Sequence, residues 1–131
     1  MKLAWFYRDS NGGAAIEFGI TAPLFFMLVV GIIEFGLLMW TQAGLQHGAA
    51  MAARCAAVNA TLCGSTSQIQ TYAAQQTMGL NPPASTFAVG PLPLFPCDKG
   101  KQVSASYSFN FVTSYFGLPS MAINAQSCFP T

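Results

Sequence analysis

A long apolar segment near the N-terminus restricts what this chain can fold into. Between Phe18 and Met39 the sequence contains a single ionisable residue, Glu34. Such a segment is long enough to cross the hydrocarbon core of a bilayer, which takes about 20 helical residues. Only 7% of the residues are charged, against roughly 25% in soluble globular domains. The sequence therefore predicts one membrane-spanning helix that contacts the lipid bilayer.

The residues before and after this segment predict how it is oriented in the membrane and whether it stays attached to the mature chain. Lys2 and Arg8 precede it, and basic residues next to a span tend to stay in the cytoplasm. A secretory signal peptide has an apolar region of only about 7–15 residues, followed by a cleavage site with small residues. Here the run is longer and passes into a further helical pattern at 42–58 without a turn. We expect a retained helix at 13–40, with an unprocessed signal anchor as the alternative.

The sequence GGAAIEF at 12–18 precedes the main apolar run. A glycine, four small or apolar residues, a glutamate and an aromatic residue in this order resemble the prepilin-peptidase site of type IV pilins. With glutamate followed directly by phenylalanine, the site is similar to that of the tight-adherence (Tad) pilus family. The resemblance implies a leader at 1–12 that is removed between Gly12 and Gly13, so that Glu17 is the fifth residue of the mature chain.

Glu17 has two interpretations. A carboxylate in the first turn of a helix is stabilised by the helix dipole, by about 0.3–1 kcal/mol at an exposed site. An ionisable residue inside a membrane, however, normally pairs with another group. The resemblance to pilins implies that this group is the N-terminal ammonium of a neighbouring subunit, and that Glu17 and Phe18 form a subunit docking site. A simple interfacial charge is the alternative.

Glu34 is a second carboxylate in the span. At 1.5 Å and 100° per residue, it lies roughly 25 Å from Glu17 and on another face of the helix, which excludes a paired-carboxylate catalytic site. We expect Glu34 near the outer boundary of the bilayer, with its side chain reaching water. Together with Pro23, the sequence GIIEFG at 31–36 is similar to the N-terminal helix of TadE-like proteins, which commonly reads "EF…P…GIIEFG".

A stripe of small residues follows the predicted span. The alanine-rich sequence predicts that the helix continues to about Asn59, which assigns 41–60 to an extracytoplasmic continuation. Small residues recur there at every fourth position, on one face of the helix: Gly44, Gly48, Ala52 and Ala56. Such a stripe allows close helix packing. Spacing alone leaves open whether the partner is the protein's own sheet or another subunit.

Four cysteines, all after the apolar segment, indicate disulfides in an oxidising compartment. A zinc site is the alternative, but no two cysteines have CxxC spacing and the single histidine, His47, lies before them. We therefore expect no metal site. Of the three possible pairings, we favour Cys55–Cys63, at the end of the long helix, and Cys97–Cys128, between a loop and the C-terminus.

The outer domain, 61–131, has the pattern of a small α+β fold. A second helix is predicted at 67–78, a short strand at 86–89, and a loop without regular structure at 90–101, where prolines are dense. Polar residues alternate with apolar ones from Val103 to Phe111, which predicts a half-buried strand. A last strand begins at Met121, pairs antiparallel with its predecessor, and brings the sheet region to its end at Cys128.

Charge and residue types exclude several function classes. A net charge of +1 without a basic patch gives nucleic-acid binding no electrostatic basis. After the predicted span the only carboxylate side chain is Asp98, so general acid–base or nucleophilic catalysis lacks its usual groups. We expect no enzymatic activity, no catalytic residues and no cofactor.

The resemblance to TadE-like proteins rests on residues 12–58 and implies a minor pilin or pseudopilin of a Tad-type pilus used for surface attachment. It implies as partners a prepilin peptidase, other pilin or pseudopilin subunits and the inner-membrane assembly machine. It also implies a bacterial inner-membrane location, with the N-terminus in the cytoplasm and the C-terminal domain in the periplasm. The alternatives are a filament-forming pilin subunit and an unprocessed membrane-anchored binding domain.

Overall fold

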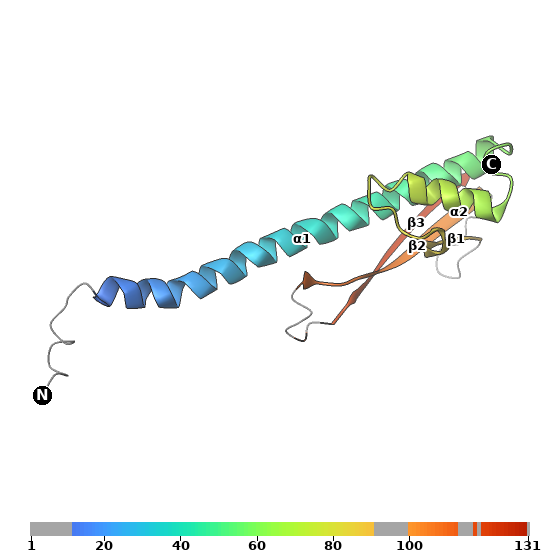
Figure 1. The fold of residues 1–131 in the computed structure, drawn as a ribbon. Coiled ribbons are helices and arrows are strands. Elements are labelled where there is room, and N and C mark those ends of the chain that lie inside the picture. The colour runs from blue at the N-terminus through green and yellow to red at the C-terminus, as the bar shows by residue number, and fades with distance from the viewer. Residues whose placement is uncertain (1–11, 91–99, 113–116, 118, 131) are drawn as a thin grey trace, which may run out of the picture. The chain divides into compact units, whose positions relative to one another are not determined.

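The computed structural model of the chain describes residues 12–90, 100–112, 117 and 119–130. Its elements, in chain order, are α1 (Gly12–Val58), α2 (Thr66–Gln75), the short 3-10 helix η1 (Ala84–Thr86), β1 (Phe87–Val89), β2 (Gly100–Phe109) and β3 (Met121–Pro130) (Figure 1). This is the predicted α+β class. The chain divides into two compact units, Met1–Gly36 and Leu37–Thr131, which we describe in turn.

The described part of the first unit is the N-terminal half of α1. Its residues are mostly apolar, and Pro23 lies inside the helix. Most of its large apolar side chains are exposed; Ile16, Phe18 and Leu24, for example, expose 67–71% of their surface. By length and composition, α1 is the one helix in the described part of the chain that can cross a membrane.

The second unit contains the sheet. Its strand order is β1-β2-β3, and both neighbouring pairs are antiparallel. Ala105 of β2 lies opposite Phe87 of β1 on one side and opposite Ala125 of β3 on the other. The predicted antiparallel pairing of the last two strands is thus confirmed.

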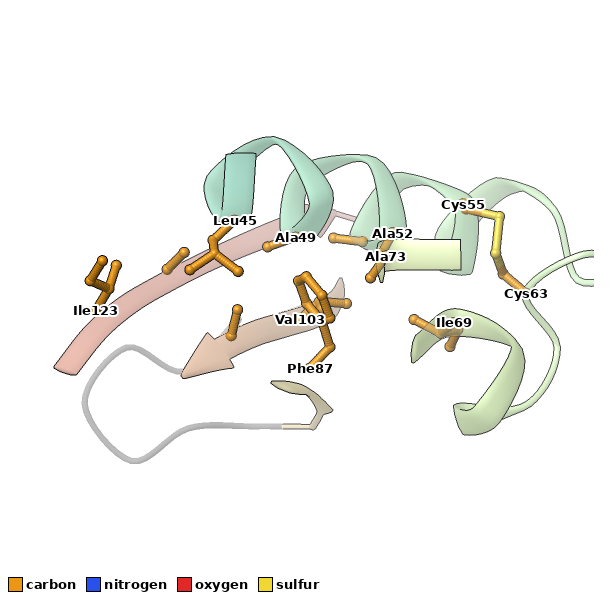
Figure 2. Packing of buried hydrophobic residues seen from close by; sticks show 13 residues of the cluster. Leu45, Ala49, Ala52, Cys55, Cys63, Ile69, Ala73, Phe87, Val103 and Ile123 are labelled. Carbon is orange, nitrogen blue, oxygen red and sulfur yellow. A yellow bond between two sulfur atoms is a disulfide. The ribbon is translucent and has the colours of Figure 1, made fainter. Parts of the chain in front are cut away.

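The core of this unit lies between the sheet, α2 and the C-terminal half of α1 (Figure 2). Thirteen buried residues form it: Leu45, Ala49, Ala52, Ala53, Cys55, Cys63, Ile69, Ala73, Phe87, Val103, Ala105, Ile123 and Ala125. Six of them are alanines, on α1, α2, β2 and β3, whose small side chains let these elements pack closely, and Phe87 is fully buried in the same cluster. In β2, Val103 and Ala105 are buried while Ser106 is exposed, as the alternating sequence predicts, but Gln102 is buried as well, against that alternation.

Glutamine side chains from both helices bind the outer edges of the sheet. On α1, Gln42 Nε2 donates to Asn124 O at 3.2 Å and Gln46 Nε2 donates to Gln126 O at 2.8 Å. On α2, Gln70 Nε2 donates to Phe87 O at 2.7 Å. Unpaired strand edges can recruit foreign strands. Both edge strands of this sheet therefore have part of their outer backbone covered.

The second helix differs in its limits from the predicted 67–78. It begins at Thr66, after the N-cap residue Ser65, and ends at Gln75. The backbone beyond it turns through left-handed conformations at Met78 (φ 55°) and Gly79 (φ 89°). Left-handed residues stop a right-handed helix. The C-terminal limit of the prediction was therefore three residues too far along the chain.

The last two strands are shifted or longer than predicted. Gly100 and Lys101 belong to β2, not to an irregular loop, because they pair with Pro130 and Phe129 of β3. The same pairing carries β3 past Cys128, so the predicted end of the sheet there is wrong. At Gly100 the strands approach so closely that an added Cβ would overlap the backbone carbonyl of Phe129. The remaining residues of the predicted loop, 91–99, lie outside the described part.

Candidate assembly site

The predicted processing site lies in the first turn of α1. Gly12 and Gly13 are exposed, and a Cβ placed on either glycine would meet no atom within 4 Å. The first N–H groups of a helix have no intrahelical acceptor, and glycine weakens a helix by about 1 kcal/mol relative to alanine. The Gly12–Gly13 peptide bond thus lies in an accessible turn that opens easily.

Glu17 and Phe18 lie one turn further along and are also exposed, Phe18 by 71%. The hydroxyl of Thr21 donates a hydrogen bond to the backbone carbonyl of Glu17 at 2.5 Å, so the polar group of Thr21 is satisfied within the helix. Gly13 and Glu17 are four positions apart and share a helix face. The carboxylate of Glu17 and the N-terminus that cleavage would create therefore lie on one side of the helix.

Glu34 contrasts with Glu17, because its side chain is only 7% exposed. It also interacts with another group. The expectation that its carboxylate reaches water is therefore wrong: burial of an ionised carboxylate is costly unless a partner compensates it. Since α1 is helical at both glutamates, their separation of about 25 Å excludes a shared acid–base site.

The stripe of small residues packs inside the second unit. A Cβ added to Gly48 would lie 2.7 Å from Ala73 O and 2.9 Å from a methyl of Thr77; one added to Gly44 would lie 2.8 Å from Thr77 O. Ala52 is fully buried in the same core. Ala56 is partly buried against it. The sequence left open the protein's own sheet or another subunit as the partner of this stripe; in the structure Gly44 and Gly48 face α2 and its C-terminal turn, and Gly48 also faces the ring of Phe87 in β1.

The predicted disulfide Cys55–Cys63 is present, with a Cα–Cα distance of 5.8 Å (Figure 2). It joins the last turn of α1 to the turn that leads to α2. Cys128 is also disulfide-bonded. Its predicted partner, Cys97, lies outside the described residues, so the Cys97–Cys128 pairing stays a prediction.

The single histidine has a structural contact. His47 Nδ1 lies 2.8 Å from Gln76 O, the carbonyl of the residue that caps the C-terminal end of α2. Within the described ranges, no group of three or more His, Cys, Asp or Glu side chains is close enough to hold a metal ion. His47 therefore links α1 to the end of α2.

The sequence interpretation gave no role to the glutamines that bind the sheet edges. Gln42 and Gln46 are one helical turn apart, and so are on one face, but this spacing does not identify their acceptors. Those acceptors, the backbone carbonyls of Asn124 and Gln126, are about 80 positions away in the sequence. The i, i+4 spacing of the two glutamines was the available sequence signal. The tertiary structure is needed to show that their partner is the edge of β3.

A family model described as TadE-like protein matches residues 12–54. The match covers the first-turn glycines, Glu17, the exposed apolar half of α1 and most of the part of α1 that packs in the second unit. No curated protein and no solved structure matches the chain. The family indicates a protein associated with the Tad pilus, and with the apolar helix it indicates an N-terminal membrane anchor. The resemblance to TadE-like proteins expected from the sequence is thus confirmed over residues 12–54.

Proposed function

We propose that this protein is a minor pilin or pseudopilin that takes part in assembling a Tad-type pilus used for surface attachment. The observation that carries the proposal is the N-terminal half of α1, an exposed apolar helix that begins at two glycines and carries an exposed carboxylate at Glu17. An apolar helix surface of this extent needs lipid or other helices around it. Both environments occur in turn when a membrane-anchored subunit joins a filament.

In this proposal a prepilin peptidase in the inner membrane cuts between Gly12 and Gly13 and leaves Gly13 as the N-terminus. The exposed glycine turn supports this step because a peptidase needs access to a locally unwound backbone. The outer domain is then periplasmic, which agrees with its disulfides. The proposal contains no catalytic step by this chain.

The new ammonium group at Gly13 would stand at the positive end of the helix dipole, which disfavours it. A carboxylate from an adjacent subunit would compensate this charge, and the exposed side chain of Glu17 is accessible for such a contact. Charged groups in a membrane are usually paired. We therefore assign Glu17, with Phe18 beside it, to docking against the N-terminus of a neighbouring pilin or pseudopilin in the assembly machine.

Processing is tested by N-terminal sequencing of the membrane-bound protein, in the parent chain and in the variants Gly12→Ala and Gly13→Ala. The two glycines have equally open surroundings, so a difference between the variants reports recognition by the peptidase rather than folding. The parent chain should begin at Gly13, and Gly12→Ala should retain the leader much more than Gly13→Ala. A parent chain that begins at Met1 is an unprocessed signal anchor and contradicts the proposal.

Docking is tested with Glu17→Gln, which keeps the size of the side chain and removes its charge. The variant should insert in the membrane at the parent level while pilus output falls. Thr21→Val is the matched control, one turn further along the same helix, because the Thr21 hydroxyl is bonded only to backbone carbonyls of its own helix. Normal pilus output from Glu17→Gln would rule out the docking role.

A filament-forming subunit is the close alternative, since the same helix can pack in a shaft. Quantitative mass spectrometry of sheared, purified pili separates the two roles. A minor pilin or pseudopilin is present at a small fraction of the main subunit or is absent from the shaft. A chain that forms most of the pilus mass is the filament subunit.

A further inference from the structure

The C-terminal end of β2 and the N-terminal end of β3 lie together at one end of a hairpin, which carries exposed apolar side chains. Val112, just after β2, is 68% exposed, and Met121, the first residue of β3, is 51% exposed. Phe111 stacks edge-on against Phe109 at a centroid distance of 5.2 Å. The sequence from 102 to 131 contains no Asp, Glu, Lys, Arg or His. This hairpin end, defined by Phe111, Val112 and Met121, is thus an apolar surface without charge.

The glutamine contacts fix where this hairpin end lies along α1, within the second unit. Gln42 binds Asn124 and Gln46 binds Gln126, so β3 runs in the same direction as the helix. Met121 precedes Asn124 by three residues, or about 10 Å of strand. About 10 Å of helix corresponds to six or seven residues. From Gln42 back to Leu37, where this unit begins, is only five residues, so the hairpin end lies at or slightly beyond the start of the unit.

That level coincides with the expected surface of the bilayer. Leu37 and Trp40 belong to the same unit as the hairpin and are 49% and 58% exposed. Tryptophan is enriched where a membrane helix passes from hydrocarbon to water, and Trp40 is the first aromatic residue at the outer end of the apolar run. The hairpin end therefore lies within about 8 Å of the level of this tryptophan along α1.

We propose that the hairpin end inserts into the interfacial layer of the bilayer and gives the outer domain a second contact with lipid besides α1. The inference rests on the proposed membrane anchoring of α1. Burial of apolar side chains stabilises by about 25 cal/mol per Å². Because residues 102–131 contain no charged side chain, insertion of the hairpin end desolvates no charge, a step that membranes penalise strongly. The outer domain is then held close to the membrane until the subunit leaves it.

Exposure alone does not carry this inference, because Val58 is as exposed as Val112, at 67%. Val58 follows Trp40 by 18 positions on the same helix, which places it about 27 Å further from the membrane. The two valines are thus a matched pair that differs in expected depth. Their comparison separates insertion in lipid from general surface hydrophobicity.

The test uses tryptophan fluorescence of the full chain in phosphatidylcholine vesicles that contain brominated acyl chains. Trp5→Phe and Trp40→Phe remove the native fluorophores, and one tryptophan is then introduced as Val112→Trp, Met121→Trp, Val58→Trp or Leu28→Trp. Leu28 lies in the apolar half of α1 and reports the anchor itself. Two hairpin positions are used so that a folding defect of one variant does not decide the outcome.

Val112→Trp or Met121→Trp should emit at shorter wavelength than Val58→Trp and be quenched by bromolipid, most strongly when the bromine atoms are close to the headgroups. Strong quenching of Leu28→Trp with none at either hairpin position overturns the hairpin inference and leaves the anchor intact. Absence of quenching at Leu28→Trp overturns both. A short-wavelength emission at the hairpin without lipid quenching indicates a protein interface and also overturns the inference.

Discussion

Gln46 of α1 and Gln126 of β3 form a reciprocal pair of hydrogen bonds. The Nε2 of Gln46 donates to the carbonyl of Gln126 at 2.8 Å, and the backbone N–H of Gln126 donates to the Oε1 of Gln46 at 3.3 Å. One side-chain amide thus binds both outward backbone groups of one edge-strand residue, as a neighbouring strand would. The helix in this way takes the place of a fourth strand at this point of the sheet.

Gln46→Met should destabilise the outer domain. The substitution keeps the length of the side chain and removes two hydrogen bonds, each worth about 0.5–1.5 kcal/mol net, so we expect a loss of about 1–2 kcal/mol at this exposed position. Denaturant unfolding of the purified full chain in detergent measures it, with hydrogen exchange of the β3 amides as the local readout. Gln75→Met is the control on α2, where the glutamine is exposed. Equal stability of both variants would contradict a role for the Gln46 pair.

Gly48→Ala should destabilise the same domain, although alanine is the better helix former. The added Cβ would lie 2.7 Å from Ala73 O, and overpacking of this kind costs about 1–3 kcal/mol, more than the gain of about 1 kcal/mol in helix propensity. The unfolding midpoint of the outer domain checks this. Gly31→Ala is the matched control, since a Cβ there meets no atom within 4 Å. A Gly48→Ala domain as stable as that of Gly31→Ala would exclude the close contact with α2.

Removal of the Cys55–Cys63 disulfide by Cys55→Ala together with Cys63→Ala should lower the free energy of unfolding by about 2–3 kcal/mol. This is the chain-entropy value for a loop of this length, given the eight-residue separation. The expected local effect is fraying of the last turn of α1, measured by hydrogen exchange at Ala56 and Val58. Unchanged protection of these amides in the double variant would contradict it.

Ser65→Ala should weaken α2 at its N-terminus. The Ser65 hydroxyl accepts from Gln68 N, while Gln68 Oε1 accepts from Ser65 N and Gly64 N, which completes a capping box. Loss of such an N-cap costs about 1 kcal/mol. Thermal unfolding followed by circular dichroism measures the change. Thr66→Ala, at the adjacent exposed residue, should have a much smaller effect, and equal effects would argue against the cap.

Local sequence signals predicted the elements of this fold well. The apolar run and the alanine-rich sequence after it predicted α1 to end near Asn59, and it ends at Val58. The alternation from Val103 predicted β2 and its buried face. These signals depend on neighbouring residues only, so they can be interpreted without knowledge of the tertiary structure. The TadE-like motif at the start of α1 was equally local.

Tertiary contacts account for what the sequence did not predict. Gly100 joins β2 because Pro130 lies opposite, and Gly48 packs on α2 because Ala73 presents its carbonyl there. In each case the deciding partner is distant in sequence. The burial of Glu34 was not predicted either.

The short sequence distance between Cys55 and Cys63 has a consequence for the order of events during export. In the topology proposed above, with α1 as the anchor and the C-terminal part exported, these two thiols would reach the oxidising side before residues 100–130 have crossed. Their bond can close while the strands are still in transit, whereas the bond of Cys128 waits for almost the whole chain. The C-terminal end of α1 would thus be cross-linked to the turn before α2 first, and β2 and β3 would pack against it afterwards.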